Sequence, residues 1–219
     1  MSCLLVSATA REIDPFLTHY RQSDMTDLDI LVAGIGMTAT TYALAKQIAL
    51  KRPYIIIQAG IAGCFDENLS KGSVVVVKKD TIADLSVMEN KQLKTMFDLG
   101  LVNLKEPPFK NGWLENPHRA LIRQTKLKPV NAVSVNHIST SKKMIGSYRD
   151  KFEPVTESME GAALHYVCLM ENIPFLQLRS ISNYIGERNK AKWDFRNSII
   201  NLNKELLRIV EGLSTGKSK

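Results

Sequence analysis

Short apolar segments alternate with longer amphipathic ones over most of the 219-residue chain. The apolar segments run for five to nine residues and are rich in β-branched side chains. Most lack the strict polar alternation of a half-exposed strand, which is typical of strands buried on both faces. They lie at 3–7, 28–34, 54–59, 73–78, 131–138 and 174–182.

The segments between these predicted strands have helical spacing. One helix is predicted to start near Thr9, a second spans about 37–51 and ends before Pro53, and a third follows the segment 157–161. This order of strands and helices predicts a three-layer αβα fold of the α/β class, in which helices flank a central, mostly parallel mixed sheet. A last helix, over about 192–212, carries an apolar stripe of Trp193, Phe195, Ile199, Ile200, Leu202, Leu206, Leu207 and Val210.

Residues 85–130 interrupt this alternation. They contain Pro107 and Pro108, the mixed run KNGWLENPHR and one expected helix. We interpret them as an excursion that carries a substrate-covering loop or a subunit contact. Because the chain has no internal repeat and no linker, we expect one domain over 1–219, with a disordered tail from about 214 to 219.

Composition and cysteine content indicate an ordinary intracellular globular protein. Hydrophobic residues make up 44% and charged residues 23% of the chain. The cysteines, Cys3, Cys64 and Cys168, are odd in number and far apart, which favours reduced thiols over a disulfide framework. The first residues lack the basic start and long apolar run of a signal peptide or membrane span. We therefore expect a cytoplasmic protein that does not bind membranes.

The formal net charge of +7 does not by itself indicate nucleic-acid binding. Nucleic-acid-binding surfaces combine a dense stripe of Lys and Arg with interleaved aromatics, and the sequence contains no such stripe. A modest positive field still favours an anionic small substrate.

Unusual residues follow four of the predicted strands. Ligands in open α/β sheets bind outside the carboxyl ends of the strands, so these positions are candidates for a binding site. They are Glu12 after the first strand, the glycine turns at 34–36 and 60–63, and the pair of segments 157–161 and 179–183.

Each of these features also has an ordinary structural interpretation. The sequence Gly34-Ile35-Gly36 fails the dinucleotide-binding pattern because its third position is Ala39, and it can simply be a tight turn. Glu160 can interact with a helix dipole, or its carboxylate can accept two hydrogen bonds from a ribose diol. Asn183 can be a turn residue, or its amide can accept from a purine N7–H and donate to a 6-oxo group.

Taken together, these segments resemble the purine nucleoside phosphorylase and methylthioadenosine nucleosidase superfamily. The resemblance rests on SATAREID, VAGIGMTATTYAL, QAGIAGCFDENLSKGSVVVV and, most diagnostically, ESMEGAALHYVCLMENIPFLQLRSISN. It implies the nucleoside-phosphorylase fold and cleavage of a purine N-ribosidic bond, with relatives that are commonly homo-oligomers of two or more subunits.

The resemblance also implies roles for individual residues. Glu12 takes the place of the carboxylate that orients the attacking water, Glu160 that of the ribose-binding glutamate, and Asn183 that of the aspartate that protonates the purine. The remaining residues expected to bind the substrate are Met159 beside the sugar, Ala62 and Gly63 on the ribosyl side, Asn136 and Ile138 at the end of the strand 131–138 on the base side, and Ser182.

Two departures from the superfamily pattern narrow the expected reaction. Gln58 stands where phosphorylases carry a phosphate-binding arginine, which favours water as the nucleophile. Asn183 in place of aspartate suits a 6-oxopurine such as hypoxanthine. The run RSISNYIGERNKAKW further resembles the futalosine hydrolases of menaquinone biosynthesis, which split futalosine into hypoxanthine and dehypoxanthine futalosine. Arg188 is a candidate to meet the carboxylate on the 5′ substituent, although solvation of a helix end is the favoured interpretation of this residue.

Other functions stay open on the sequence alone. The same superfamily includes methylthioadenosine/adenosylhomocysteine nucleosidases and purine nucleoside phosphorylases, and a non-catalytic nucleoside-binding protein or a dinucleotide-binding reductase is an alternative of another class. The four histidines and three cysteines show no metal-ligand spacing, so we expect neither a metal nor a cofactor.

Overall fold

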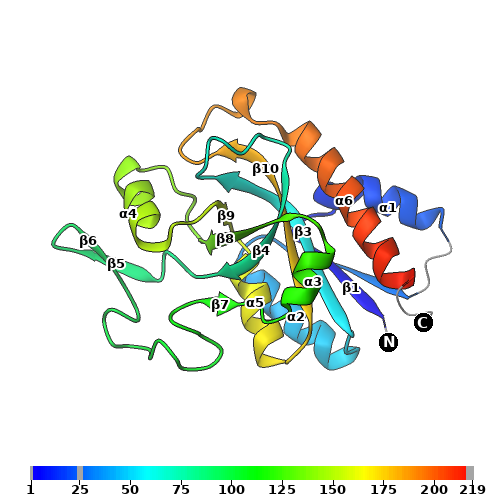
Figure 1. Cartoon of the computed structure of the whole chain (residues 1–219), viewed down its shortest axis with the longest axis horizontal. Coiled ribbons are helices and arrows are strands. Elements are labelled where there is room, and N and C mark those ends of the chain that lie inside the picture. Colours follow the sequence, from blue (N-terminus) through cyan, green and yellow to red (C-terminus); the bar gives the residue numbers. More distant parts are fainter. Residues whose placement is uncertain (1, 24–26, 216–219) are drawn as a thin grey trace.

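The computed structural model describes residues 2–23 and 27–215 and is built around one large mixed sheet (Figure 1). The strands follow the order β10-β4-β8-β9-β3-β1-β2, and β7 pairs with β4. Their bounds are β1 (Cys3–Ser7), β2 (Leu28–Val32), β3 (Ile55–Cys64), β4 (Val74–Asp80), β7 (Leu114–Glu115), β8 (Lys128–Ser134), β9 (Thr156–Ser158) and β10 (Phe175–Tyr184).

Strands β3 and β10 form the spine of this sheet. They run parallel to each other, and β1 pairs in parallel with both β2 and β3. Because β10 also pairs with β4, β4 with β8, β8 with β9 and β9 with β3, the pairings close into a ring. The carboxyl ends of β3 and β10 therefore lie together, with Asn183 opposite Gly63.

Helices cover both faces of the sheet, as the sequence predicts (Figure 1). On one face, α2 (Met37–Leu50) and α5 (Gly161–Met170) pack through Leu44, Leu164 and Val167. On the other, α1 (Asp14–Arg21) and α6 (Phe195–Thr215) pack through Phe16 and Leu206. Each such side chain contributes about 1.5–3 kcal/mol through its burial.

Three strand boundaries near the predicted site differ from the sequence-based prediction. β3 continues through the segment 60–63, which the glycines indicate as a turn, because β10 pairs with it along its length. Its glycines serve close packing: an ideal Cβ on Gly60 would lie 2.4 Å from Nη1 of Arg179. β10 continues to Tyr184, so Asn183 is a strand residue, whereas β8 ends at Ser134, before Asn136 and Ile138.

The excursion at 85–130 contains the one helix expected there, α3 (Arg119–Gln124). It also contains a hairpin that the sequence analysis does not predict, made of β5 (Ser86–Glu89) and β6 (Gln92–Thr95). Asn90 and Lys91 turn this hairpin with φ of 49° and 65°, the left-handed conformation that two-residue hairpin turns need. The hairpin packs against α4 (Lys142–Phe152) through the cluster that includes Leu93 and Ile145.

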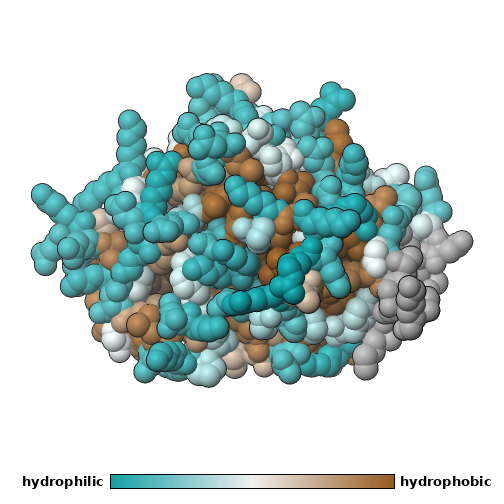
Figure 2. All heavy atoms as spheres, viewed as in Figure 1, coloured by the Kyte–Doolittle hydropathy of each residue, from teal (hydrophilic) through white to brown (hydrophobic). Residues whose placement is uncertain are grey.

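Hydrophilic residues protrude over the face seen in Figure 2, and apolar residues lie between and beneath them. No helix among residues 2–23 and 27–215 is long and apolar enough to cross a membrane. The expected tail at 214–219 begins inside α6, which runs to Thr215, and residues 216–219 lie outside the described part of the chain.

Candidate active site

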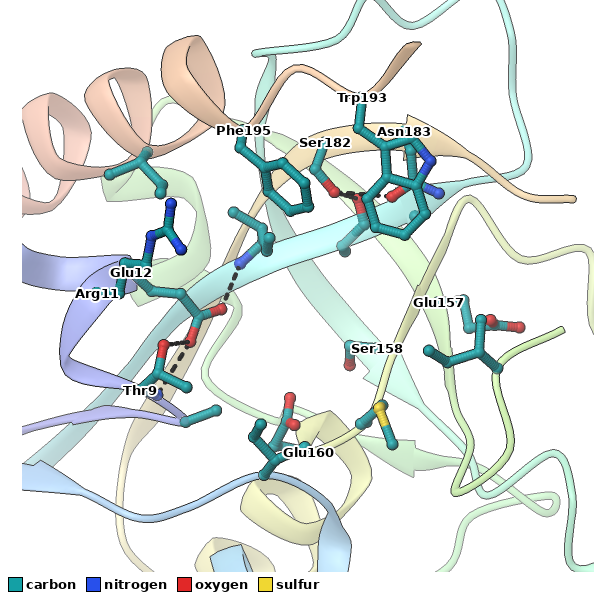
Figure 3. Close-up of a pocket in the computed structure, with 18 of the residues that line it drawn as sticks. Thr9, Arg11, Glu12, Glu157, Ser158, Glu160, Ser182, Asn183, Trp193 and Phe195 are labelled. Atoms are coloured by element: carbon teal, nitrogen blue, oxygen red, sulfur yellow. Dashed lines mark hydrogen bonds between the residues drawn. The ribbon is translucent and has the colours of Figure 1, made fainter. Parts of the chain in front are cut away.

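A pocket of about 550 Å³ lies at the carboxyl ends of β1, β3 and β10 (Figure 3). It brings together side chains from the first, middle and last parts of the chain. Figure 3 shows Glu12 and Glu160 on one side of it and Asn183 on the other. Of the residues predicted from the sequence to form the site, those that line the pocket are Glu12, Ala62, Gly63, Ile138, Met159, Glu160, Ser182 and Asn183.

Asn136 is the predicted site residue that does not line this pocket. It is exposed in the loop that follows β8, and its backbone N–H donates to Oδ2 of Asp84 at 2.5 Å. The prediction assumed that β8 continues to Ile138, but the chain turns away after Ser134.

Glu12 is held at the pocket edge by neutral donors. It lies on the 3₁₀-helix η1 (Ala10–Ile13), where Oε2 accepts from the backbone N–H of Thr9 at 3.1 Å and from the Thr9 hydroxyl at 3.0 Å. Oε1 accepts from the backbone N–H of Ile61 at 3.0 Å, which links the carboxylate to β3. The Ser7 hydroxyl also lies 3.3 Å from Oε2, so these contacts fix the orientation of the carboxylate and leave Oε1, which accepts one bond, able to accept another from a water molecule.

The segment that carries Glu12 is anchored by α6. The side-chain amide of Asn203 donates to the backbone carbonyl of Glu12 at 2.9 Å and accepts from the backbone N–H of Phe16 at 3.0 Å. This link joins residues 191 positions apart in the sequence. The last helix therefore supports the start of the chain at the pocket.

Glu160 is buried as the N-cap residue of α5. Its Oε1 accepts from the backbone N–H of Gly36 at 3.1 Å, and its Oε2 lies 3.6 Å from Nη1 of Arg179. Gly36 has φ of 92°, a conformation that a residue with a Cβ rarely adopts. The Gly34–Gly36 turn thus orients a carboxylate, and the carboxylate in turn faces the pocket.

Arg179 is a charged residue that lies in the predicted segment 179–183 but to which the sequence-based prediction gives no role. It is fully buried on β10, and its Nη2 donates to Oε1 of Gln58 at 2.9 Å. Its Nε has no partner among the described residues. An arginine inside a strand as apolar as FLQLRSIS is the signal that could have revealed it. Gln58 is buried behind Arg179 and does not line the pocket.

The opposite end of the pocket presents an amide instead of a carboxylate. Oδ1 of Asn183 accepts from the hydroxyl of Ser182 at 2.8 Å, and Nδ2 donates to the backbone carbonyl of Tyr184 at 3.1 Å. The hydroxyl of Ser182 also reaches the carbonyl of Ala62 at 3.2 Å. The orientation of the amide is thereby tied to both spine strands.

Glu157, a further pocket carboxylate beside Glu12 and Glu160, lies in the predicted segment 157–161 without an individual predicted role, on the side shared with Asn183 (Figure 3). It accepts from the backbone N–H of Ser139 at 3.0 Å and from the Ser139 hydroxyl. Burial raises its pKa, although the bonds from Ser139 act against this rise. Glu157 thereby fastens the loop that carries Ile138 to the pocket floor.

Apolar and cationic side chains complete the rim. Phe195 and Ile199 line it from the start of α6, and Trp193 lines it from the segment just before α6, which begins later than the predicted helix start at about 192; the sequence predicts all three only as part of an apolar helix stripe. Arg11 and Lys190 supply positive charge. Arg188, the candidate for a substrate carboxylate, does not line the pocket, and its guanidinium lies 5.6 Å from the centre of the Trp193 ring.

Residues 20–214 match the family model described as the Phosphorylase superfamily. The chain belongs to this superfamily. The prediction of its fold class is confirmed, because solved structures of superfamily enzymes share the arrangement of the chain over almost its whole length.

Relatives of this phosphorylase-superfamily chain carry two names. It is 29% identical to a futalosine hydrolase of Streptomyces coelicolor over 82% of the chain and 76% of the relative. It is also 29% identical to a 5′-methylthioadenosine/S-adenosylhomocysteine nucleosidase of Glaesserella parasuis, over 77% and 73%. The native structure of a Helicobacter pylori futalosine hydrolase has a TM-score of 0.80 at 19% identity, covering 97% of this chain and 98% of that one.

The superfamily member described here thus has a pocket with a distinct charge pattern. Glu12 and Glu160 lie at one end, where Glu160 is beside the buried cation of Arg179, and the amide of Asn183 lies at the other end. Carboxylates can hold hydroxyl groups and a water molecule, and they stabilise a developing positive charge between them. The described residues contain no cluster of three or more His, Cys, Asp or Glu side chains that could hold a metal ion.

Proposed function

We propose that this chain hydrolyses the N-ribosidic bond of futalosine, releasing hypoxanthine and dehypoxanthine futalosine. The observation that carries the proposal is the polarity of the pocket, with Glu12 and Glu160 at one end and the amide of Asn183 at the other. A nucleoside bound along this axis places its sugar between the carboxylates and its base at the amide. Relatives named futalosine hydrolase support this choice of substrate.

The proposed reaction passes through a ribosyl cation. Glu160 accepts hydrogen bonds from the 2′ and 3′ hydroxyls, and its negative charge stabilises the cation that develops at C1′. Glu12 orients a water molecule on the opposite side of the sugar from the leaving base and takes a proton from it as it attacks. The C1′–N9 bond breaks and its electron pair leaves with the base, which takes up a proton from solvent water at N7 and departs as neutral hypoxanthine, while Glu12 returns its proton to solvent.

Asn183 is proposed to bind the leaving hypoxanthine at N7 and O6. Its amide can accept from N7–H and donate to O6, which an ionised carboxylate could not do. Ser182 keeps this amide oriented through its bond to Oδ1. The pocket positions of the remaining residues support contacts of Met159 with the sugar, of Ala62 and Gly63 with the ribosyl side, and of Ile138 with the base.

Water is a better nucleophile for this site than phosphate. A phosphate at C1′ would lie against the carboxylate of Glu12, and two like charges at about 4 Å repel by about 4 kcal/mol near a protein surface. The nearby cation of Arg179 is turned toward Glu160 and Gln58. Turnover is therefore expected to be independent of added phosphate.

Release of the free base tests the proposal directly. The enzyme is incubated with futalosine or 5′-methylthioadenosine, with and without phosphate, and the products are separated by chromatography. We expect hypoxanthine from futalosine, in equal amounts with and without phosphate. Release of adenine from methylthioadenosine with no turnover of futalosine would instead identify a methylthioadenosine/adenosylhomocysteine nucleosidase, the second candidate, whose name relatives of equal identity carry.

Substitution of the proposed base tests the mechanism. Glu12→Gln is expected to lower kcat by about 10²–10⁴, the usual contribution of a positioned general base, with little change in thermal stability. The exposed Glu67→Gln provides a matched control that should keep full activity.

Tight nucleoside binding with a flat progress curve in the unaltered protein would favour a non-catalytic nucleoside-binding protein, and binding of a nicotinamide dinucleotide would favour a reductase.

The proposal extends to the whole protein. We propose a single domain over 1–219 that acts in the cytoplasm as a homo-oligomer. Support for self-association comes from exposed apolar side chains on α2 and α5, the helix pair beside the pocket: Tyr42, Tyr166 and Met170.

A further inference from the structure

A chain of buried polar groups lies beneath the first turn of α5, outside the pocket. Asp80, at the end of β4, is fully buried, and its Oδ1 accepts from the hydroxyl of Ser134 at 3.0 Å. The oxygen of that hydroxyl in turn accepts from the backbone N–H of Ala162 at 2.8 Å. The amino end of α5 is thus connected through one serine to a buried carboxyl group.

The packing around Gly161 shows how close Asp80 lies to the residue that follows Glu160. An ideal Cβ on Gly161 would lie 2.3 Å from Oδ2 of Asp80 and 2.1 Å from Nε2 of Gln177. Gln177 itself donates to Oδ2 of Asp80 at 3.2 Å. The carboxyl group therefore packs directly against the backbone that places Glu160 in the pocket.

Charged groups on the elements around Asp80 make its ionisation relevant to the pocket. Arg179 lies two residues after Gln177 on β10, so both side chains point to the same face of the strand. The positive charge of Arg179 favours the ionised form of Asp80 and also attracts Glu160. His165, on α5, has a pKa lowered to about 4 by burial, so it does not supply a counter-charge at neutral pH.

We propose that Asp80 is a positioning residue for Glu160, holding the start of α5 through Ser134 and competing with Glu160 for the charge of Arg179. The inference rests on the proposed function, in which Glu160 holds the ribose hydroxyls. Ionised Asp80 gives the hydrogen-bond chain a charged acceptor, which strengthens it. When Asp80 is neutral, the chain weakens and Arg179 attracts Glu160 alone, so that Glu160 is drawn away from the sugar.

This role predicts a pH dependence of substrate binding. Burial raises the pKa of Asp80 to about 6, against the opposing effects of Gln177, Ser134 and Arg179. Asp80 therefore takes up a proton as the pH falls through about 6. Below that pH the hold on Glu160 weakens, and the KM for the nucleoside is expected to rise.

The test compares Asp80→Asn, which keeps the shape of the side chain but cannot titrate, with the unaltered enzyme. At pH 7.5 we expect the KM to rise about tenfold, the effect of losing one charge-assisted hydrogen bond, with kcat changed less than about threefold. The KM of the unaltered enzyme should rise between pH 7 and 5, whereas that of Asp80→Asn should stay level. Asp98→Asn, which removes a surface carboxylate bonded to Lys151, is the matched control.

Ser134→Ala provides a second variant if Asp80→Asn does not fold, since it removes the connection to Ala162 and leaves Asp80 in place. We expect it to raise the KM and to keep the pH dependence. Unchanged KM in the folded variants, or the same pH profile in Asp80→Asn as in the unaltered enzyme, would overturn the role of Asp80. Absence of futalosine hydrolysis by the unaltered enzyme would contradict the proposed function instead, and the affinity for inosine, measured by calorimetry on the same proteins, would then test the role of Asp80.

Discussion

A few single side chains make the two ends of the pocket chemically different. Glu12 and Glu160 are acceptors without a proton to donate when ionised, whereas Asn183 offers both a donor and an acceptor. In the proposed reaction, the purine leaving group is therefore selected at one position, by whether the side chain can donate to the substituent at C6. Ser182 fixes the positions of the amide oxygen and nitrogen of Asn183, because its hydroxyl donates to Oδ1.

Asn183→Asp is expected to exchange the preferred base. An aspartate oxygen in the place of Nδ2 would face the carbonyl of Tyr184, now 3.1 Å from that nitrogen, and this repulsion favours the protonated acid. Such an acid can protonate N7 of adenine but no longer matches O6 of hypoxanthine as the amide does. The ratio of kcat/KM for futalosine to that for methylthioadenosine should fall at least about tenfold, because one unmatched hydrogen bond costs about 1–3 kcal/mol.

Some charged residues at the pocket could be predicted from the sequence, and others could not. Glu12 could be predicted because it follows a recognisable apolar strand, and Glu160 because it precedes an apolar helix, each within a superfamily motif. Arg179 was missed because its role depends on Gln58, on another strand, and on Gly60, whose missing Cβ leaves room for the guanidinium. The apolar run FLQLRSIS marks Arg179 as unusual, but no local pattern along the chain shows which residues of other strands it contacts.

Helix α5 is the element on which the site depends most closely. Its first turn presents Glu160 to the pocket and is held from below by Ser134, and Gly161 is the residue that lets Asp80 and Gln177 approach the helix backbone. Helix periodicity predicts α5 but not this contact, because a glycine at a helix start has several interpretations. The continuation of β3 through 60–63 was likewise hidden, since its glycines have the composition of a turn.

Gly161→Ala is expected to destabilise the protein. The added Cβ would lie 2.1 Å from Nε2 of Gln177 and 2.3 Å from Oδ2 of Asp80, so the buried chain must move, at a cost of about 1–3 kcal/mol in the free energy of unfolding. Urea denaturation measures the change. Gly146→Ala on α4 is the matched control, because its Cβ would meet nothing within 4 Å, and it should stabilise by about 0.5–1 kcal/mol. Equal effects of the two substitutions would contradict the close packing at Gly161.

At the scale of the whole molecule, apolar residues remain exposed along one side. Tyr42 on α2 is 68% exposed, and Met170 on α5 is 57% exposed, on helices that pack against each other. Ile35, 63% exposed, both lines the pocket and borders this side. The helices of this surface were predicted from their periodicity, but their exposed faces were not, because both helices are apolar around much of their circumference.

The α2–α5 surface is expected to join two copies of the chain. Tyr42→Glu should place an unpaired charge in that contact and convert the oligomer to monomer, which sedimentation velocity detects as a lower molar mass. Leu85→Glu serves as the control, because Leu85 is exposed and lies outside α2 and α5. Tyr54 is not a suitable control position, because it packs against the core and a charge there would disturb it. A monomeric unaltered protein at micromolar concentration would contradict self-association.

The hydrogen bond between Asn203 and the backbone carbonyl of Glu12 has a consequence for how the pocket forms during protein synthesis. Synthesis of a protein proceeds from the amino end, so the residue proposed to activate water emerges from the ribosome long before the helix that anchors it. Trp193 and Phe195 also emerge late, and they supply the rim of the same pocket. A chain without α6 would contain all the strands of the central sheet but would lack the bond that anchors Glu12. We therefore expect hydrolytic activity to appear only after α6 has been synthesised and has packed against the sheet.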